Sequence, residues 1–228
     1  MRPKVKRVVQ VLLRDYGRTF AEELSIDLKT DDASSLFRLL CVSMLFSTRI
    51  SHSIAIKAAE SVYAHGWTTP QKMAASTWGQ RVSALDEAGY VRYDERTATR
   101  LAEAAQLVLD LYNGDLGKLR AEAGCKSDQE RRLLKEFNGI GDVAVDIFFR
   151  EVQVAWPELF PFADAKAVES AKRLGLKADP KSLVALVKTK IEFARLMAAL
   201  VRVQLSHGHD RIIEAASGHA VPSPAFPV

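Results

Sequence analysis

The sequence predicts an all-α protein, and three observations lead to that prediction. Apolar residues recur with the period of a helix face along most of the 228 residues. No stretch alternates between apolar and polar residues for long enough to make a strand. Capping residues, prolines and glycines divide the chain into segments of helical length.

The first half of the chain has clear start and stop signals for helices. Within residues 5–16, one stripe holds Val8, Val9, Leu12 and Leu13. A second helix is expected to begin near Ser34, after several capping candidates. A third is expected to begin at Ser51 or Ser53 and to end at Gly66.

The middle of the chain continues the pattern. Residues 69–76 and 77–89 predict two short helices, each with a Thr or Pro start. Residues 94–114 give the strongest helix signal, because they are rich in Ala, Leu, Glu and Arg. Asn113 and Gly114 are typical residues to end that helix.

Later segments are also expected to be helical. Residues 127–137 begin with Ser127 and carry Glu130 three positions on, which predicts a capping box. The last helices are expected within 164–175 and 179–208.

The C-terminal stretch is expected to be different. Residues 218–228 hold three prolines and few helix formers, which predicts an irregular or mobile tail. His207, His209 and His219 are interpreted as parts of this surface region, since no fourth ligand for a metal lies near them in the sequence.

Composition narrows the class of protein. With 48% hydrophobic and 26% charged residues, the chain is globular in composition and long enough for a real core. The formal charge of +4 is compatible with a polyanion partner without requiring one. Two cysteines are too few for a disulfide framework, and no apolar run has signal-peptide or membrane-spanning form. We therefore expect a soluble, cytoplasmic protein without a membrane partner.

The segment Gly139-Ile140-Gly141 joins two amphipathic stretches. Glycines allow a tight hairpin between packed helices, and Ile140 can enter the core to hold it. The start of the second helix leaves backbone N–H groups unpaired, and these can bind a phosphate. A plain turn between two helices is the alternative interpretation.

The residues after this hairpin carry a resemblance. A Pro-containing loop with Pro161 leads to Asp164, and the next helix ends in the sequence RLGL at 173–176. With Gly139 and Gly141, this order resembles the helix-hairpin-helix/Gly-Pro-Asp superfamily of base-excision DNA glycosylases, in its endonuclease III-like branch. Two further segments are similar to that branch, and the resemblance extends over most of the chain, from about 34 to 205; the segments are 36–63 and 85–105.

The resemblance implies an all-α, two-lobed fold with a DNA-binding cleft. We expect residues 33–155 to form the lobe with the helix-hairpin-helix element. Residues 1–32 and 156–228 would form the second lobe, with the Asp164 loop and the C-terminal tail.

The sequence departs from the family pattern at three places. Bifunctional members carry a nucleophilic lysine two positions after the second hairpin glycine, where this chain has Val143, which cannot attack a sugar. Relatives of endonuclease III hold an iron–sulfur cluster on four cysteines near the end, and this chain has only Cys41 and Cys125. About three extra residues separate the hairpin from Asp164. We expect no iron–sulfur cluster and no cofactor, although hairpins of this family sometimes hold a monovalent cation.

Asp164 is the expected catalytic residue. Cleavage of a base–sugar bond develops positive charge on the sugar ring, which a nearby carboxylate can stabilise while it orients water. The alternative interpretation is that Asp164 only caps the following helix, and the two roles are compatible.

The resemblance also implies a set of DNA contacts. Hairpin residues would hold phosphates, while other side chains would fill the gap left by an extruded base. Asp142 is expected at the hairpin although its charge opposes a phosphate, and Tyr90 is nearly as well explained as a core aromatic. The expected DNA-binding residues are Gly139, Ile140, Gly141, Asp142, Arg49, Thr48, Tyr90 and Lys166.

The function that these features favour is a monofunctional, base-excision repair DNA glycosylase. Its partner would be double-stranded DNA with a damaged or mismatched base, and we expect a monomer associated with the nucleoid. A non-catalytic DNA-binding protein of the same fold is the first alternative. A helical scaffold unrelated to DNA is the second.

Overall fold

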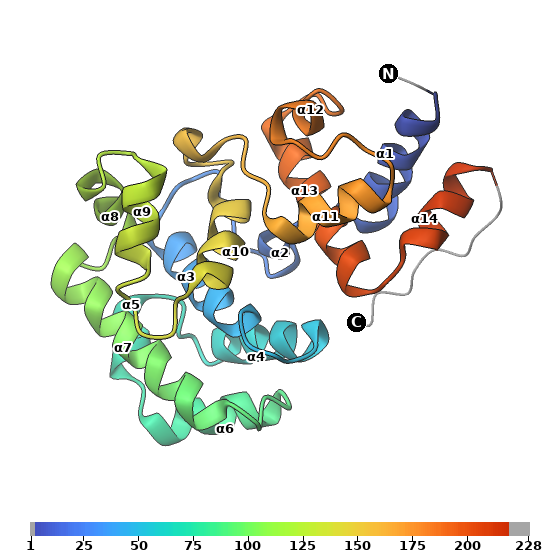
Figure 1. The fold of residues 1–228 in the computed structure, drawn as a ribbon. Coiled ribbons are helices and arrows are strands. Elements are labelled where there is room, and N and C mark those ends of the chain that lie inside the picture. The colour runs from blue at the N-terminus through green and yellow to red at the C-terminus, as the bar shows by residue number, and fades with distance from the viewer. Residues whose placement is uncertain (1–2, 219–228) are drawn as a thin grey trace. The chain divides into compact units, whose positions relative to one another are not determined.

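The computed structural model describes residues 3–218 of the chain, and its regular structure is helical (Figure 1). It contains fourteen α-helices and a short 3-10 helix, and no strand occurs within 3–218. The predicted all-α class is therefore confirmed. Helix periodicity along the sequence was sufficient to identify it.

The chain divides into two compact units. We call Leu24–Glu158 the hairpin unit, and Met1–Glu23 together with Leu159–Val228 the terminal unit. The divisions fall at 23/24 and 158/159, whereas the expected lobes were divided at 32/33 and 155/156. The expected cleft for DNA stays a prediction.

In the hairpin unit, helices gather around one buried helix. Helix α3 packs against α4, α7, α8 and α10, and most of its side chains are buried. Because α3 is apolar on nearly every side, it can serve as the centre of this core. The unit contains α3 (Ala33–Phe46), α4 (His52–Ala64), α5 (Pro70–Ala75), α6 (Trp78–Glu87), α7 (Asp94–Tyr112), α8 (Leu116–Glu122), α9 (Ser127–Leu134) and α10 (Asp142–Val152). The 3-10 helix η1 (Pro157–Leu159) follows at the division between units.

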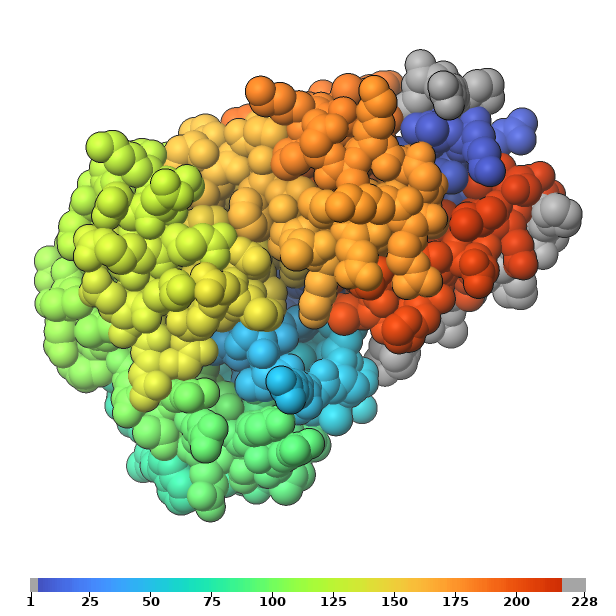
Figure 2. Space-filling model, viewed as in Figure 1, coloured from blue at the N-terminus to red at the C-terminus, as the bar shows by residue number. Residues whose placement is uncertain are grey.

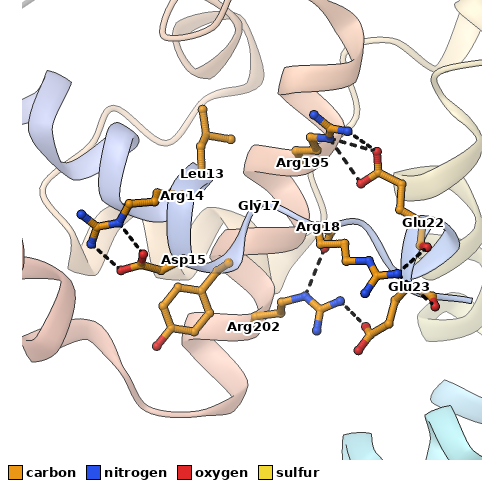
Figure 3. Close-up of a pocket in the computed structure, with 10 residues that line it drawn as sticks. Leu13, Arg14, Asp15, Gly17, Arg18, Glu22, Glu23, Arg195 and Arg202 are labelled. Atoms are coloured by element: carbon orange, nitrogen blue, oxygen red, sulfur yellow. Dashed lines mark hydrogen bonds and ion pairs between the residues drawn. The ribbon is translucent and has the colours of Figure 1, made fainter. Parts of the chain in front are cut away.

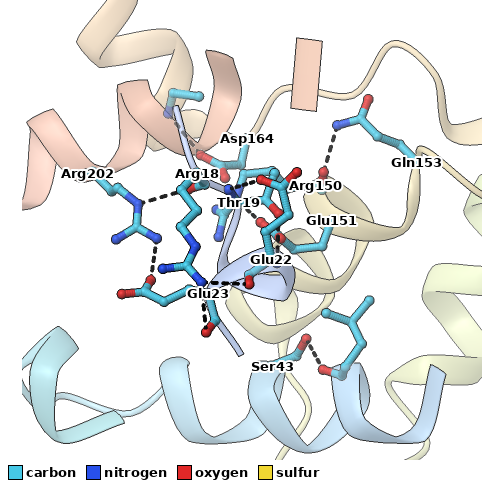
Figure 4. A network of polar contacts seen from close by, with 12 residues as sticks. Arg18, Thr19, Glu22, Glu23, Ser43, Arg150, Glu151, Gln153, Asp164 and Arg202 are labelled. Carbon is cyan, nitrogen blue, oxygen red and sulfur yellow. Dashed lines mark hydrogen bonds and ion pairs between the residues drawn. The ribbon is translucent and has the colours of Figure 1, made fainter. Parts of the chain in front are cut away.

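Polar side chains in the buried parts of α3 and α10 bond to nearby backbone. The Ser43 hydroxyl donates to the Leu39 carbonyl (2.9 Å), and the Gln153 amide donates to the Arg150 carbonyl (2.9 Å) (Figure 4). Such bonds satisfy polar groups that water cannot reach.

In the terminal unit, α13 is the central helix. It packs against α1 and α11, and α1 also packs against α14. The unit contains α1 (Pro3–Tyr16), α2 (Phe20–Glu23), α11 (Ala165–Arg173), α12 (Pro180–Val184), α13 (Lys190–Leu205) and α14 (His209–Ala216).

Ion pairs join the short helix α2 to α13 around a surface pocket of about 320 Å³ (Figure 3). Arg195 donates to Glu22 at 2.6 Å, and Arg202 pairs with Glu23 and also donates to the Arg18 carbonyl at 3.2 Å (Figures 3 and 4). Arg18 in turn donates to the Glu22 carbonyl at 3.1 Å. A four-residue helix is too short to be stable alone, so these contacts help to hold it.

Local helix signals agree with the structure at several positions. Ser51 caps α4 by accepting from the Ile54 N–H, and Asn113 ends α7 in a left-handed conformation (φ 51°). The predicted capping box at Ser127 and Glu130 is wrong. Lys126 is the N-cap of α9 without a side-chain hydrogen bond, while Glu130 faces the interior.

The histidine interpretation is wrong in part. His209 does not lie in a surface tail: it begins α14, is buried, and its Nε2 lies 3.1 Å from the Ser170 hydroxyl. His219 and the predicted tail after Gly218 lie outside the described residues.

Glu130 is an ionisable group enclosed in the hairpin unit. No N–H or O–H donor of the described residues bonds to either of its carboxylate oxygens. Its neighbour Glu158 accepts two hydrogen bonds from Arg120, at 2.5 and 2.8 Å. Burial, together with the Glu158 carboxylate, raises the pKa of Glu130 to about 8. Glu130 is therefore largely protonated at neutral pH.

This buried acid predicts a pH-dependent stability. Glu130 ionises near 4.5 when unfolded and near 8 when folded, so the folded state holds one more proton between these values. Stability should fall as pH rises through that window. The Glu130→Gln variant should lack most of this fall, which amounts to roughly 1.4 kcal/mol per pH unit within the window, measured by urea unfolding between pH 5 and pH 9.

The exposed Glu122 of α8 supplies the control. Glu122→Gln should keep the wild-type dependence on pH. Parallel curves for wild type and Glu130→Gln would show that Glu130 is not protonated in the folded protein.

Candidate nucleic-acid interface

The turn between α9 and α10 is anchored from inside by Ile140. Its side chain is 5% exposed, and its N–H donates to the Phe137 carbonyl at 3.0 Å. Phe137 is buried as well and stacks with Tyr112 of α7, with ring centroids 6.4 Å apart. The expectation that Ile140 enters the core is confirmed. The hairpin is thus attached to the core on both sides of Gly139.

Gly139 has a conformation that other residues adopt at a cost. Its φ is +89°, and a β-carbon there would lie 2.6 Å from Arg100 Cδ. The side-chain amide of the preceding residue, Asn138, donates a hydrogen bond to the Glu103 carboxylate at 2.8 Å. Helix α7 therefore supports the outer side of the hairpin through Arg100 and Glu103. The sequence offered no signal for these contacts, because both residues look like ordinary positions on a solvated helix.

The start of α10 is open. Gly141 is its N-cap, has no side chain to cap the helix, and is exposed. A β-carbon at Gly141 would meet nothing within 4 Å. The N–H groups of Asp142 and Val143 have no carbonyl acceptor within the helix, since they belong to its first turn. Together with the positive end of the helix dipole, they form a surface that can bind an oxyanion.

Nearby cations offset the charge of Asp142. Lys135 Nζ lies 3.0 and 3.1 Å from the two Asp142 oxygens, and Arg131 lies at 3.4 Å. These contacts, the Lys135 hydrogen bond first, lower the pKa of Asp142. Arg131 also pairs with Asp146 at 2.6 Å. Asp142 is therefore a lesser obstacle to phosphate than its isolated charge suggests, but Lys135 and Arg131 are already engaged.

The two expected gap-filling residues differ in exposure. Tyr90 is fully buried, and its hydroxyl lies 2.6 Å from Thr48 Oγ1 and 3.2 Å from the Leu45 carbonyl. Burial raises the pKa of this hydroxyl. The expectation that Tyr90 touches DNA is corrected: it is a core aromatic that holds the α3 end against the α6–α7 turn. Arg49, next to Thr48, is exposed in the loop between α3 and α4.

The α6–α7 turn exposes the residue after Tyr90 instead. Val91 is 62% exposed. Figure 2 shows the yellow surface around the hairpin and the light-blue surface of the α3–α4 segment on one side of the hairpin unit. The structure thus brings Thr48 and Tyr90 into contact, and the hairpin and the α3–α4 loop onto one face.

Asp164 lies in the terminal unit, at the start of α11. Its carboxylate accepts from the Ala167 N–H at 2.9 Å, and its side chain is 6% exposed. The loop before it is held by Phe160, whose ring meets Phe193 of α13 edge-on at 5.3 Å. The capping role expected for Asp164 is therefore present. A carboxylate fixed in this way has a restricted orientation, as a positioned acid requires.

The remaining expected residues lie near these features. Lys166 is exposed in the first turn of α11. Val143, at the position of the family's lysine, is 50% exposed in the first turn of α10. Their contacts with DNA stay predictions.

Neither a metal centre nor a membrane span is visible in the described part of the chain. Residues 3–218 contain no group of three or more His, Cys, Asp or Glu side chains that could hold a metal ion. In the same residues, no helix combines the length and apolarity needed to cross a bilayer.

Comparisons with known proteins give few matches. No family model matches the sequence, and no curated protein matches it. One similar solved structure is described as "Structure of a Trapped Endonuclease III-DNA Covalent Intermediate: Estranged-Adenine Complex". It is 17% identical, with a TM-score of 0.46 over 72% of this chain and 71% of that chain. A likeness of this size carries no argument about activity.

The two hairpin glycines predict different responses to alanine. Gly139→Ala should lower the free energy of unfolding by about 1–2 kcal/mol, because its φ is positive and Arg100 occupies the space. Gly141→Ala should cost less, about 0.5 kcal/mol, since its φ is −103° and the space is open, and the loss comes only from the poorer N-cap that Ala makes. Urea unfolding measures both. Equal losses for the two variants would contradict the described hairpin geometry.

Proposed function

We propose that this protein is a monofunctional DNA glycosylase, which hydrolyses the bond between a damaged or mismatched base and its sugar. The observation that carries the proposal is the hairpin: a buried Ile140 between two glycines leaves the first turn of α10 exposed and uncapped. This arrangement fits a role in binding a DNA phosphate better than a role as a simple connection between two helices. In the proposal, the hairpin unit binds the strand and the terminal unit supplies the acid.

Asp164 is the proposed catalytic residue. Its carboxylate would stabilise the positive charge that develops on the sugar as the base leaves, and it would orient the attacking water. The helix cap and the Phe160 contact hold the group in place before substrate arrives.

Val143 supports the monofunctional part of the proposal. A lyase step requires an amine that attacks the sugar and forms an imine. Valine has no nucleophile, so water would complete the reaction and leave an abasic site. No iron–sulfur cluster or other cofactor is invoked.

Val91 takes the place of Tyr90 in the proposed contact with extruded DNA. A side chain must occupy the gap when a base leaves the stack. Val91 in the α6–α7 turn and Arg49 in the α3–α4 loop are exposed residues that could do so. Tyr90 would act only by supporting that turn through its bond with Thr48.

A non-catalytic DNA-binding protein remains the second candidate. Val143 favours it, because this position offers no nucleophile for a reaction on the sugar. Duplex binding without release of any base from a broad panel would select this alternative.

The catalytic role of Asp164 is tested by a conservative substitution. Asn caps helices about as well as Asp, so Asp164→Asn should keep the fold and duplex binding. We expect base release to fall at least 100-fold. The assay incubates duplexes containing uracil, thymine glycol, alkylated purines or mismatches, and then reveals abasic sites with alkali.

Asp179 is a matched control for this experiment. It caps α12 by accepting from the Ser182 N–H at 2.9 Å, as Asp164 caps α11, but it is exposed. Asp179→Asn should release base at the wild-type rate. Full activity in Asp164→Asn would rule out the proposed role of Asp164.

The absence of a lyase amine predicts the result of a chemical trap. Borohydride reduction during reaction with a substrate duplex should yield no covalent protein–DNA complex, because Val143 cannot form an imine. A lyase of known activity on the same duplex is the positive control. A trapped complex would contradict the monofunctional assignment.

A further inference from the structure

Charge is unevenly divided between the two units. The hairpin unit has 16 Lys and Arg against 19 Asp and Glu, a net −3. The terminal unit has 16 against 9, a net +7. The whole basic excess of the protein therefore lies in the unit without the hairpin.

Within the terminal unit, the basic residues concentrate between 165 and 190. This segment holds seven Lys or Arg but only two acids, Glu169 and Asp179. Asp179 is engaged as the cap of α12. We call the seven basic residues the lysine surface; all are exposed, and they are Lys166, Lys172, Arg173, Lys177, Lys181, Lys188 and Lys190. Figure 2 shows the segment as a continuous orange area.

The lysine surface differs from the hairpin cations in its partners. Across the described residues, none of its seven side chains forms an ion pair with a carboxylate. Arg131 and Lys135 of the hairpin unit, in contrast, are paired with Asp142 and Asp146. An unpaired cation can bind a phosphate without first giving up a carboxylate.

The layout favours an extended anion over a small one. Lys166 and Arg173 lie seven residues apart on α11, which is roughly 10 Å along the helix. Lys190 lies 5.5 Å from the centre of the Phe160 ring, in the loop that leads to Asp164. The cations therefore extend from the end of α11 to the Asp164 loop, a distribution that suits the repeated charges of a nucleic-acid backbone.

Two other extended anions, an anionic membrane and an acidic protein, fit the lysine surface less well. Membrane-binding basic surfaces add exposed large apolar residues that enter the bilayer. Within 165–191 the only exposed large hydrophobic residue is Ile191, at 36%, and a single such side chain is a weak bilayer anchor. Protein interfaces favour aromatic residues and Arg, whereas six of these seven residues are Lys.

We propose that the lysine surface is a second, sequence-independent binding site for the phosphate backbone of duplex DNA, and that it supplies most of the salt-dependent affinity. This inference goes beyond the proposed reaction, because it requires neither base release nor an intact Asp164. It assigns the electrostatic part of binding to α11, α12 and the start of α13.

The test neutralises three lysines far from Asp164 in sequence. Wild type and the triple variant Lys177→Gln/Lys181→Gln/Lys188→Gln are titrated with an undamaged 20-base-pair duplex at several salt concentrations. The variant should bind roughly 10- to 100-fold more weakly at 0.1 M salt. The slope of log K against log salt should fall in magnitude by about 2 to 3.

A charge-matched control comes from the hairpin unit. Lys57, Lys72 and Lys118 are exposed, and replacing all three by Gln removes the same charge. That variant should keep the wild-type slope to within about 1. Thermal unfolding confirms that both triple variants are folded.

The outcomes separate this inference from the proposed function. An unchanged slope in the Lys177/Lys181/Lys188 variant, or equal losses in both triple variants, overturns the inference. So does wild-type protein that prefers phosphatidylserine vesicles or poly-glutamate to the duplex. The predicted slopes without base release from any damaged duplex would uphold the inference and reject the glycosylase proposal.

Discussion

The burial of one side chain, Ile140, determines what the hairpin can do. Its insertion beside Phe137 fixes the turn between α9 and α10 from the inside. Neither neighbouring glycine then needs a side chain for anchoring, so no side chain of theirs keeps a ligand away from the backbone of the turn. The first N–H groups of α10 remain open because Gly141 offers no cap. Packing, rather than surface charge, therefore creates the candidate phosphate site.

The hairpin and the lysine surface offer an anion different kinds of positive group. At the hairpin, Arg131 and Lys135 are paired with Asp142 and Asp146, so backbone N–H groups are the main means of binding an anion there. On the lysine surface, no side chain forms an ion pair with a carboxylate of the described residues, so the side chains themselves can bind an anion. The two modes have different physical signatures. Binding by backbone N–H groups depends on close approach, whereas binding by lysines depends on ionic strength.

Local signals in the sequence predicted the helices well. Ser51 and Asn113 end helices through contacts with residues a few positions away, which the sequence contains directly. Asp164 was expected as a cap for the same reason, and it is one. Its catalytic role stays a proposal, because it depends on what the carboxylate meets beyond its own helix.

Burial of polar residues was the part that sequence reasoning missed. Glu130 has the spacing of a capping box, yet its neighbours Glu158 and Arg120 come from other parts of the chain. Tyr90 lies beside a glycine in a turn, yet the end of α3 covers it. His209 is covered by α11 through Ser170. Contacts between distant segments decided each case, and no local pattern contains them.

The most direct measurement is a crystal structure with a duplex that carries a positively charged pyrrolidine in place of the target nucleotide. This ring imitates the charge of the sugar as the base departs. Our account predicts the Asp164 carboxylate beside the ring nitrogen and a strand phosphate on the N–H groups at the start of α10. A pyrrolidine bound away from Asp164, or a hairpin that leaves the DNA untouched, would contradict it.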